Sequence, residues 1–275
     1  MPLNLTPYLL QLLLKASPQY GTKLSRTLVI GLAALLISLH SLSTKAETLT
    51  FLVQNSQPKY FLDQGEKLGL CGEIYFQLSK KLQQYDIDGT VLPHYMPLRR
   101  IFSMVEAGPS YVFCGSSRTA AREKRFGFIN IPLYLISYVL LAHKDEEVDP
   151  ASFAELKATE GIIGTLFGTR SAQGLKDQLG QQVNDSFQEL DTPLRMMSAP
   201  PYRLRYFYYH DLGLNYLAKE SGLPLKVLSN RFKTHPQWLI HSKDLKPETI
   251  EALSTIMAEM ETSGELDKIV KKYIY

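Results

Sequence analysis

Hydrophobic and polar positions along residues 47–275 follow two patterns, one typical of short strands and one typical of amphipathic helices. Apolar runs predict strands, and apolar residues spaced three and four apart predict helices. The predicted strands are 49–54, 90–95, 111–114, 135–143, 161–165, 206–209 and 237–241. The predicted helices are 72–82, 97–107, 151–156, 172–179, 212–220, 247–261 and 266–273. Alternation of strands and helices predicts an α/β fold.

Two groups of alternating strands and helices follow one another, and long apolar segments that could cross between them join the two groups. This order predicts two lobes around a cleft. Lobe 1 would comprise residues 47–138, with residues 236–275 returning to it, and lobe 2 would comprise residues 143–232. Ligands in such folds collect at the carboxyl ends of strands and at the helix starts that follow. We therefore expect the binding residues at those ends.

The first 46 residues differ in pattern from the rest of the chain. An apolar run, Thr27–Leu42, follows Lys23 and Arg26 and precedes Thr44-Lys45-Ala46. A basic segment, an apolar segment and a small-residue exit are the parts of a secretory signal peptide. We expect residues 1–46 to be a signal peptide cleaved near Ala46, which predicts a periplasmic or secreted protein. A retained N-terminal membrane anchor is the alternative.

The charge balance changes when this segment is removed. Residues 1–46 hold four of the 30 basic side chains and none of the 27 acidic ones. The rest of the chain therefore has 26 basic and 27 acidic side chains. A nearly neutral surface gives no electrostatic reason to expect binding to nucleic acid or to an anionic membrane. No later segment is long and apolar enough to span a bilayer.

The chain contains two cysteines, Cys71 and Cys114. Export would bring both into an oxidising compartment, where a disulfide between them could form. The alternative is two small buried apolar residues, because sequence alone does not place the two Cα atoms within bridging distance.

The candidate chemistry lies between Cys114 and Tyr134. Small hydroxyl residues follow an apolar run, and Arg122 comes five residues after Ser117. A guanidinium group pairs well with a carboxylate, so this pattern predicts the binding of a small anion and not its conversion. The alternative for Arg122 is a solvated residue at a helix start, in a run of charges that continues to Arg125.

Several motifs together resemble the extracellular solute-binding proteins of family 3, the periplasmic amino-acid receptors of ABC importers. The likeness covers nearly all of the chain after residue 46. It implies the two-lobed periplasmic binding protein fold of type II, in which each lobe is a mixed sheet flanked by helices and the ligand binds between the lobes. The matching segments are Gly69–Ile74, Ser117–Arg122, Phe128–Tyr134, Phe167–Thr169, Ser242–Asp244, Ser263–Ile269 and Lys272-Tyr273.

The resemblance also implies roles for individual residues. Arg122 would hold the ligand carboxylate in a bidentate pair. Ser117, Thr119 and Thr169 would add hydroxyl or backbone donors, and Tyr60 would cover the apolar part of the ligand.

The acceptor for the ligand's amino group would come from lobe 2. Chemistry favours Asp211 and the spacing along the chain favours His210, so both stay open. Arg100, Arg118 and Arg170 could also face the cleft, which would favour an anionic or dicarboxylic ligand. The alternative for each of these three arginines is a surface position on a helix.

The resemblance implies a monomer that captures an amino acid or related carboxylate for an ABC permease. A sensory binding protein without a transporter is a second hypothesis. A third is an enzyme on the same scaffold, similar to cyclohexadienyl or prephenate dehydratase, with Glu73 or Asp211 as the proton donor. The histidines and cysteines match no zinc motif, and nucleotide-binding glycine motifs are absent, so we expect neither a metal nor a cofactor.

Overall fold

The computed structural model describes residues 47–61 and 68–274. The predicted signal peptide, and the membrane anchor that is its alternative, lie outside the described residues. No helix within the described ranges is long and apolar enough to cross a membrane.

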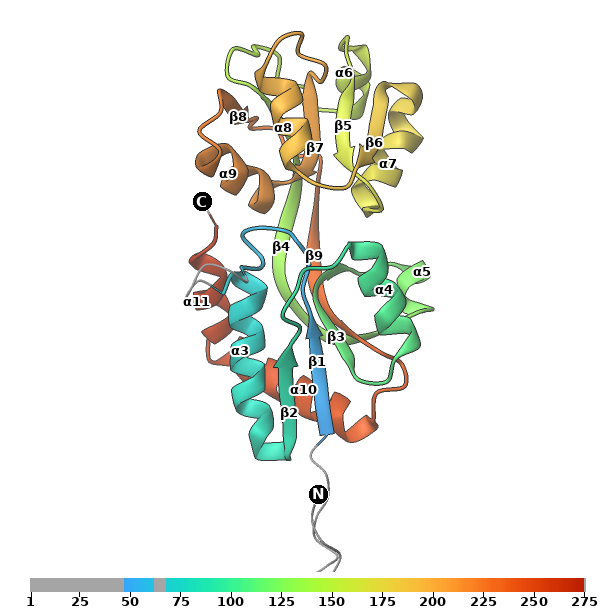
Figure 1. The fold of residues 1–275 in the computed structure, drawn as a ribbon, viewed down its shortest axis with the longest axis vertical. Helices are drawn as coiled ribbons and strands as arrows, with labels where there is room; N and C mark the ends of the chain where they lie inside the picture. The colour runs from blue at the N-terminus through green and yellow to red at the C-terminus, as the bar shows by residue number, and fades with distance from the viewer. Residues whose placement is uncertain (1–46, 62–67, 275) are drawn as a thin grey trace, which may run out of the picture. The chain divides into compact units, whose positions relative to one another are not determined.

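The described residues form a mixed nine-stranded sheet with helices packed against it (Figure 1). The strands are β1 (Glu47–Leu52), β2 (Ile87–Val91), β3 (Tyr111–Ser117), β4 (Gly127–His143), β5 (Ile163–Leu166), β6 (Val183–Phe187), β7 (Tyr206–His210), β8 (Leu225–Val227) and β9 (Lys233–His241). The helices are α3 (Leu70–Leu82), α4 (Leu98–Ala107), α5 (Ala120–Glu123), α6 (Phe153–Ala158), α7 (Arg170–Leu179), α8 (Asp191–Ser198), α9 (Asp211–Glu220), α10 (Pro247–Thr262) and α11 (Glu265–Lys271).

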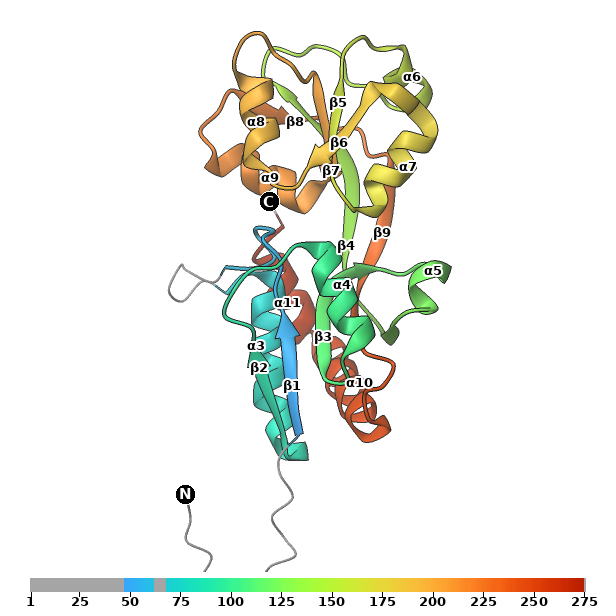
Figure 2. The same ribbon diagram turned by 45° about the vertical axis from the view of Figure 1, so that its right-hand side comes forward.

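The strand order is β2-β1-β3-β9-β4-β7-β5-β6, and β8 pairs with β4. Strand β1 pairs in parallel with β2 and β3, and β5 pairs in parallel with β6 and β7. Strands β4 and β9 pair antiparallel and run side by side between these two parallel groups (Figures 1 and 2). The last predicted strand therefore returns to the middle of the sheet, beside β3.

Two groups of buried apolar residues form the core. The larger surrounds β1 and β3 and includes Phe51 and Phe113, and the apolar face of α3 packs into it. The smaller includes Leu141 and Phe207, on the face of β4 and β7 that α8 and α9 cover. Side chains alternate between the two faces of a strand, so β4 and β7 contribute to both groups.

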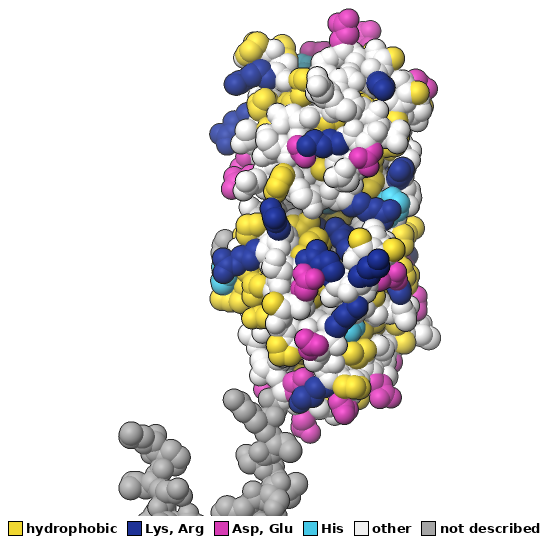
Figure 3. Space-filling view, turned by 90° about the vertical axis from the view of Figure 1, so that its right-hand side faces the viewer, with side chains coloured by type: hydrophobic (Ala, Val, Ile, Leu, Met, Phe, Trp, Pro, Cys, Tyr) yellow, Lys and Arg dark blue, Asp and Glu magenta, His cyan; other side chains and the backbone are white. Residues whose placement is uncertain are grey.

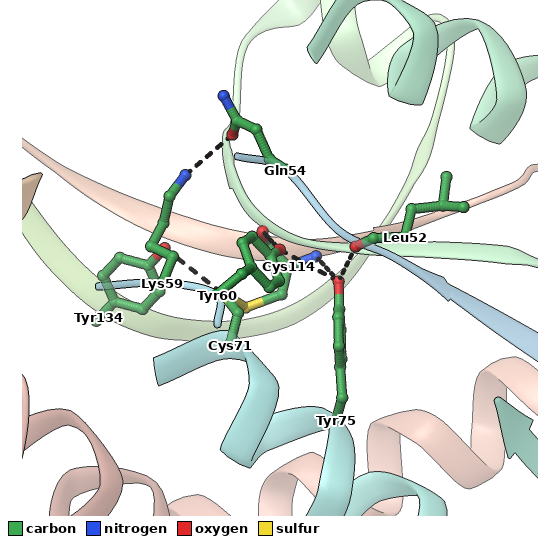
Figure 4. Close-up of a disulfide and its surroundings, with 8 residues drawn as sticks. All are labelled: Leu52, Gln54, Lys59, Tyr60, Cys71, Tyr75, Cys114 and Tyr134. Carbon is green, nitrogen blue, oxygen red and sulfur yellow. Dashed lines mark hydrogen bonds between the residues drawn. A yellow bond between two sulfur atoms is a disulfide. The ribbon is translucent and has the colours of Figure 1, made fainter. Parts of the chain in front are cut away.

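A disulfide joins Cys71 at the start of α3 to Cys114 in β3, with the two Cα atoms 5.8 Å apart (Figure 4). Of the two alternatives that the sequence leaves open, the structure contains the disulfide. Gly115 follows at a bulge in the pairing of β3 with β9, with φ at +93°. A Cβ there would lie 2.6 Å from the hydroxyl of Tyr134, so this turn requires glycine.

Some elements differ from the sequence prediction. Strand β2 ends at Val91, whereas the prediction placed it at 90–95, because Pro93 has no N–H to donate to a ladder. Strand β6 was missed because its polar sequence, Val-Asn-Asp-Ser-Phe, is tolerated at the edge of the sheet. Helices α5 and α8 and strand β8 were missed as well.

Candidate functional site

A cavity of about 50 Å³ lies where the ends of β3 and β7 approach the start of α7 and the crossing strands. Five residues that the sequence predicted as ligand contacts line it: Ser117, Arg122, Thr169, Arg170 and His210. The complete lining is Gln54, Lys59, Leu98, Phe102, Gly115, Ser117, Arg122, Ile136, Tyr138, Thr169, Arg170, Ser171, Tyr209, His210 and Gln237.

Arg122 is held in place by its neighbours at the end of β3. Its Nη1 donates to the carbonyl of Ser117 at 3.0 Å and to Oγ of Ser116 at 3.3 Å. Its guanidinium carbon lies 4.6 Å from the ring centroid of Phe102. Burial lowers the pKa of Arg122 to about 10, so the group remains a cation at neutral pH. Arg122 lines the cavity, and its guanidinium group has further donors that these two bonds do not use.

Thr169 caps helix α7 at the cavity. Its Oγ1 accepts from the backbone N–H of Ala172 at 3.2 Å and donates to the carbonyl of Leu166 at 2.7 Å. Arg170 and Ser171 follow in the first turn, and both line the cavity. The start of a ten-residue helix carries positive potential, which favours an anion here.

His210 and not Asp211 lines the cavity. His210 is buried at the end of β7, and its Nδ1 accepts the backbone N–H of Gly213 at 2.9 Å. The other ring nitrogen, Nε2, therefore carries the proton, and it is buried without a hydrogen-bond partner among the described residues. Burial, reinforced by the charge of Lys59, lowers the pKa of His210 well below its usual value. The imidazole is thus neutral and offers one free donor.

Asp211 lies in a different environment. One of its carboxylate oxygens accepts the backbone N–H groups of Ser137 at 3.0 Å and Leu212 at 2.8 Å. The other pairs with Arg231. Asp211 borders a separate surface depression that includes Arg231 and Leu135. Of the two candidates that the sequence left open, the structure brings only His210 into the cavity.

Lys59 is a lining residue that the sequence analysis missed. Its side chain is only 6% exposed, and its Nζ donates to Oε1 of Gln54 at 3.2 Å (Figure 4). Burial lowers its pKa to about 8. Its position directly before Tyr60 was the available signal, since the resemblance marks that segment as a ligand contact. Lysine is mostly found at surfaces, which argued against choosing it.

Tyr138 of β4 and Gln237 of β9 are buried lining residues that also went unpredicted. Gln237 donates from Nε2 to Oγ of Ser117 at 3.1 Å. Burial raises the pKa of Tyr138, while hydrogen bonds with Ser117 and Ser171 and the nearby guanidinium charges oppose the shift. Both crossing strands therefore contribute polar groups to the cavity.

Besides Asp211, four predicted contacts lie outside this lining. Tyr60 is buried in the core and donates to the carbonyl of Cys114 at 2.6 Å. Thr119 caps α5 by accepting from the N–H of Arg122 at 3.2 Å. Arg100 is exposed on α4.

Arg118 is the fourth, and it is exposed. It pairs with Glu123 and lies 5.3 Å from the ring centroid of Trp238. The backbone carbonyl of Arg118 accepts a hydrogen bond from Nη1 of Arg170, a lining residue, at 3.4 Å. Arg118 therefore helps to position Arg170.

The cavity has a larger neighbour of about 470 Å³, and Gln54 and Leu98 line both. The larger one also contains Arg99, Phe167 and Glu189. Figure 3 shows a hollow in the middle of this face of the molecule, with Lys and Arg side chains around it.

Comparison with known proteins identifies the fold. The ancestral amino-acid-binding protein AncCDT-1, described as a precursor of cyclohexadienyl dehydratase, is similar with a TM-score of 0.70 and 19% identity, over 86% of this chain and 99% of that one. The substrate-binding protein of an amino acid ABC transporter is similar with a TM-score of 0.67 and 18% identity, over 82% of this chain and 98% of that one. ArtJ, an arginine-, lysine-, histidine-binding protein from Geobacillus stearothermophilus, is similar with a TM-score of 0.66 and 14% identity, over 82% of this chain and 94% of that one.

These identities establish the fold alone, the two-lobed type II architecture of periplasmic binding proteins. None of the curated proteins matches the chain by sequence. The sequence profile of the bacterial extracellular solute-binding proteins, family 3, matches residues 49–275, nearly all of the chain after the predicted signal peptide. The chain therefore belongs to the bacterial extracellular solute-binding proteins of family 3.

Proposed function

We propose that this protein captures a small polar carboxylate, an amino acid or a related anion, for delivery to an ABC-type importer. The observation that carries the proposal is Arg122, a half-buried guanidinium that lines the cavity and has no carboxylate partner among the described residues. A buried cation of this kind is stable when a ligand supplies the opposite charge. We infer that the mature protein acts as a monomer in the periplasm or outside the cell.

Closure of two lobes is the proposed mechanism. The lining includes Ser117 and Arg122 from predicted lobe 1 (residues 47–138 and 236–275) and Thr169 and His210 from predicted lobe 2 (residues 143–232). A ligand that contacts both groups binds the closed arrangement more tightly than the open one and shifts the population toward it. An importer could then recognise the closed form.

The dehydratase hypothesis lacks the acid that it needs. Glu73 accepts from Nζ of Lys272 at 2.6 Å and from the hydroxyl of Tyr273 at 2.5 Å, and Asp211 is paired with Arg231. Neither carboxylate lines the cavity. Binding without chemistry is therefore the better-supported function, although one structural neighbour is described as a precursor of a dehydratase.

Thermal unfolding against a panel of amino acids and small carboxylic acids, with product analysis of each mixture, tests the proposal. A ligand at a hundred times its Kd adds about 2.7 kcal/mol, which raises the midpoint by about 5 to 10 °C in a protein of this size. Stabilisation without turnover supports the receptor. Conversion of a prephenate-like substrate to product would contradict the receptor proposal and support the dehydratase hypothesis.

Arg122→Ala should weaken binding of the confirmed ligand about a hundredfold, because it removes charge-assisted hydrogen bonds worth about 3 kcal/mol. Arg125→Ala is the matched control, since Arg125 lies one turn further, pairs with Glu106 and does not line the cavity. Isothermal titration calorimetry measures both. Equal affinities for the two variants would show that Arg122 is not the clamp.

A further inference from the structure

The cavity gathers cations that have no partner of opposite charge. Lys59, Arg122 and Arg170 line it, and no lining residue within the described ranges carries a carboxylate. None of the three forms an ion pair with a described acidic residue, whereas Arg231, outside the cavity, pairs with Asp211. Arg170 is exposed, whereas Lys59 is buried and Arg122 is half-buried, so one bound carboxylate would leave one of these two less exposed charges uncompensated.

The hydrogen-bonding groups point to the same kind of ligand. Nε2 of His210 is a proton donor, His210 is only 5% exposed, and no acceptor among the described residues reaches this nitrogen. Lys59 has used one of its three donors, on Gln54. Leaving a buried donor unpaired is costly, so a ligand that fits this wall of the cavity carries acceptors.

An α-amino group would be unfavourable here. A ligand ammonium is a further cation and needs an acceptor, and the carboxylate predicted to hold it is already engaged. Asp211 accepts two backbone N–H groups and pairs with Arg231, and it does not line the cavity. Neutral His210, whose only acceptor atom is bonded to Gly213, cannot take its place.

We propose that the solute is a dicarboxylic acid that carries no amino group, an inference that rests on the proposed function above. One carboxylate pairs with Arg122, and the second accepts from Lys59 and from Nε2–H of His210. Arg170, at the start of α7, adds the third positive charge. The ligand thus supplies the negative charge that the described lining lacks and an acceptor for Nε2–H of His210.

Two matched pairs of acids test this directly, because the members of each pair differ only in the amino group. Calorimetry compares succinate with aspartate and glutarate with glutamate on the full mature protein. We expect the acid without the amino group to bind more tightly by tenfold or more in at least one pair. Equal or tighter binding of aspartate and glutamate would overturn the inference and leave the proposed function standing.

Failure of every acid in this set and in the wider panel would overturn the proposed function itself. A second comparison tests whether the site needs two carboxylates on the ligand or only one. Butyrate, with a single carboxylate, should bind at least tenfold more weakly than succinate, and Lys59→Gln should remove most of that difference. An unchanged ratio of affinities in Lys59→Gln would show that Lys59 does not hold the second carboxylate.

A designed change of preference completes the test. His210→Asp places a carboxylate in the cavity, and aspartate can cap α9 as His210 does, so the variant should fold. Its ratio of succinate to aspartate affinity should fall at least tenfold. His94→Asp adds the same charge at an exposed position outside the lining and should leave the ratio unchanged. If the two variants behave alike, His210 does not face the ligand.

Discussion

At the scale of single residues, Lys59 combines a charge with nearly complete burial. Its partner in the structure is the neutral side chain of Gln54, and burial lowers its pKa from 10.5 to about 8. At pH 7 the empty protein therefore keeps a buried ammonium group without a counter-charge among the described residues. Sites prepared for a ligand commonly reduce the stability of the empty protein in this way.

Replacing this lysine should stabilise the empty protein. Because the folded pKa lies below the unfolded one, the cost of the charge is fully present below pH 8 and disappears as the pH rises toward 10.5. Lys59→Met should thus raise the free energy of unfolding by about 3 kcal/mol at pH 7, because that is the free energy that corresponds to lowering the pKa from 10.5 to about 8. Urea unfolding of both proteins at pH 7 and pH 10 measures the difference. A less stable variant at pH 7, or a pH-independent difference, would refute this account of Lys59.

At the scale of secondary-structure elements, the disulfide connects the start of α3 to the middle of β3, three residues before Ser117 at the end of that strand. It closes a loop with a sequence separation of 43 residues. It therefore restrains the unfolded chain, and in the folded protein it fixes the strand end that presents Ser117 to the cavity.

Removal of the disulfide in the double variant Cys71→Ala/Cys114→Ala should lower the free energy of unfolding by about 4 kcal/mol, the loop-entropy value for this separation. Circular dichroism during urea unfolding gives the midpoint. Reductant should shift the natural protein in the same direction and leave the double variant unaffected. Coincident unfolding curves for the oxidised and reduced natural protein would contradict the prediction.

The elements and the site differ in how far the sequence could predict them. Long apolar segments such as β4 were visible because a strand buried on both faces is apolar throughout. Strand β6 was hidden by its polar residues. In the site, Arg122 could be found because its spacing matches a motif. Lys59 lies outside every predicted element, and Tyr138 lies in the predicted strand 135–143, where an aromatic residue gives no sign that it faces a cavity. Its charge alone predicts a surface position for a lysine, and its aromatic ring alone predicts a core position for a tyrosine.

At the scale of the whole molecule, the paired strands β4 and β9 carry the chain between its two parallel strand groups, and both contribute to the cavity lining. Residues from both predicted lobes meet at one small space. Arg170 of predicted lobe 2 also donates to the carbonyl of Arg118 in predicted lobe 1.

Closure on the ligand should make the protein more compact. Small-angle X-ray scattering of the mature protein should show a smaller radius of gyration at saturating ligand than without it, near the value of about 17 Å expected for a compact chain of this size. Arg122→Ala at the same ligand concentration should keep the larger radius. An unchanged radius on saturation of the natural protein would rule out closure as the mechanism.

The position of β9 also determines when the protein can fold during its synthesis. β9 lies between β3 and β4, and α10 and α11 follow it in the chain and pack against α3. A nascent chain that ends before Lys233 lacks a central strand and two covering helices. Contacts between such distant segments form late. The order of the strands thus delays completion of the fold until nearly the whole chain has been synthesised.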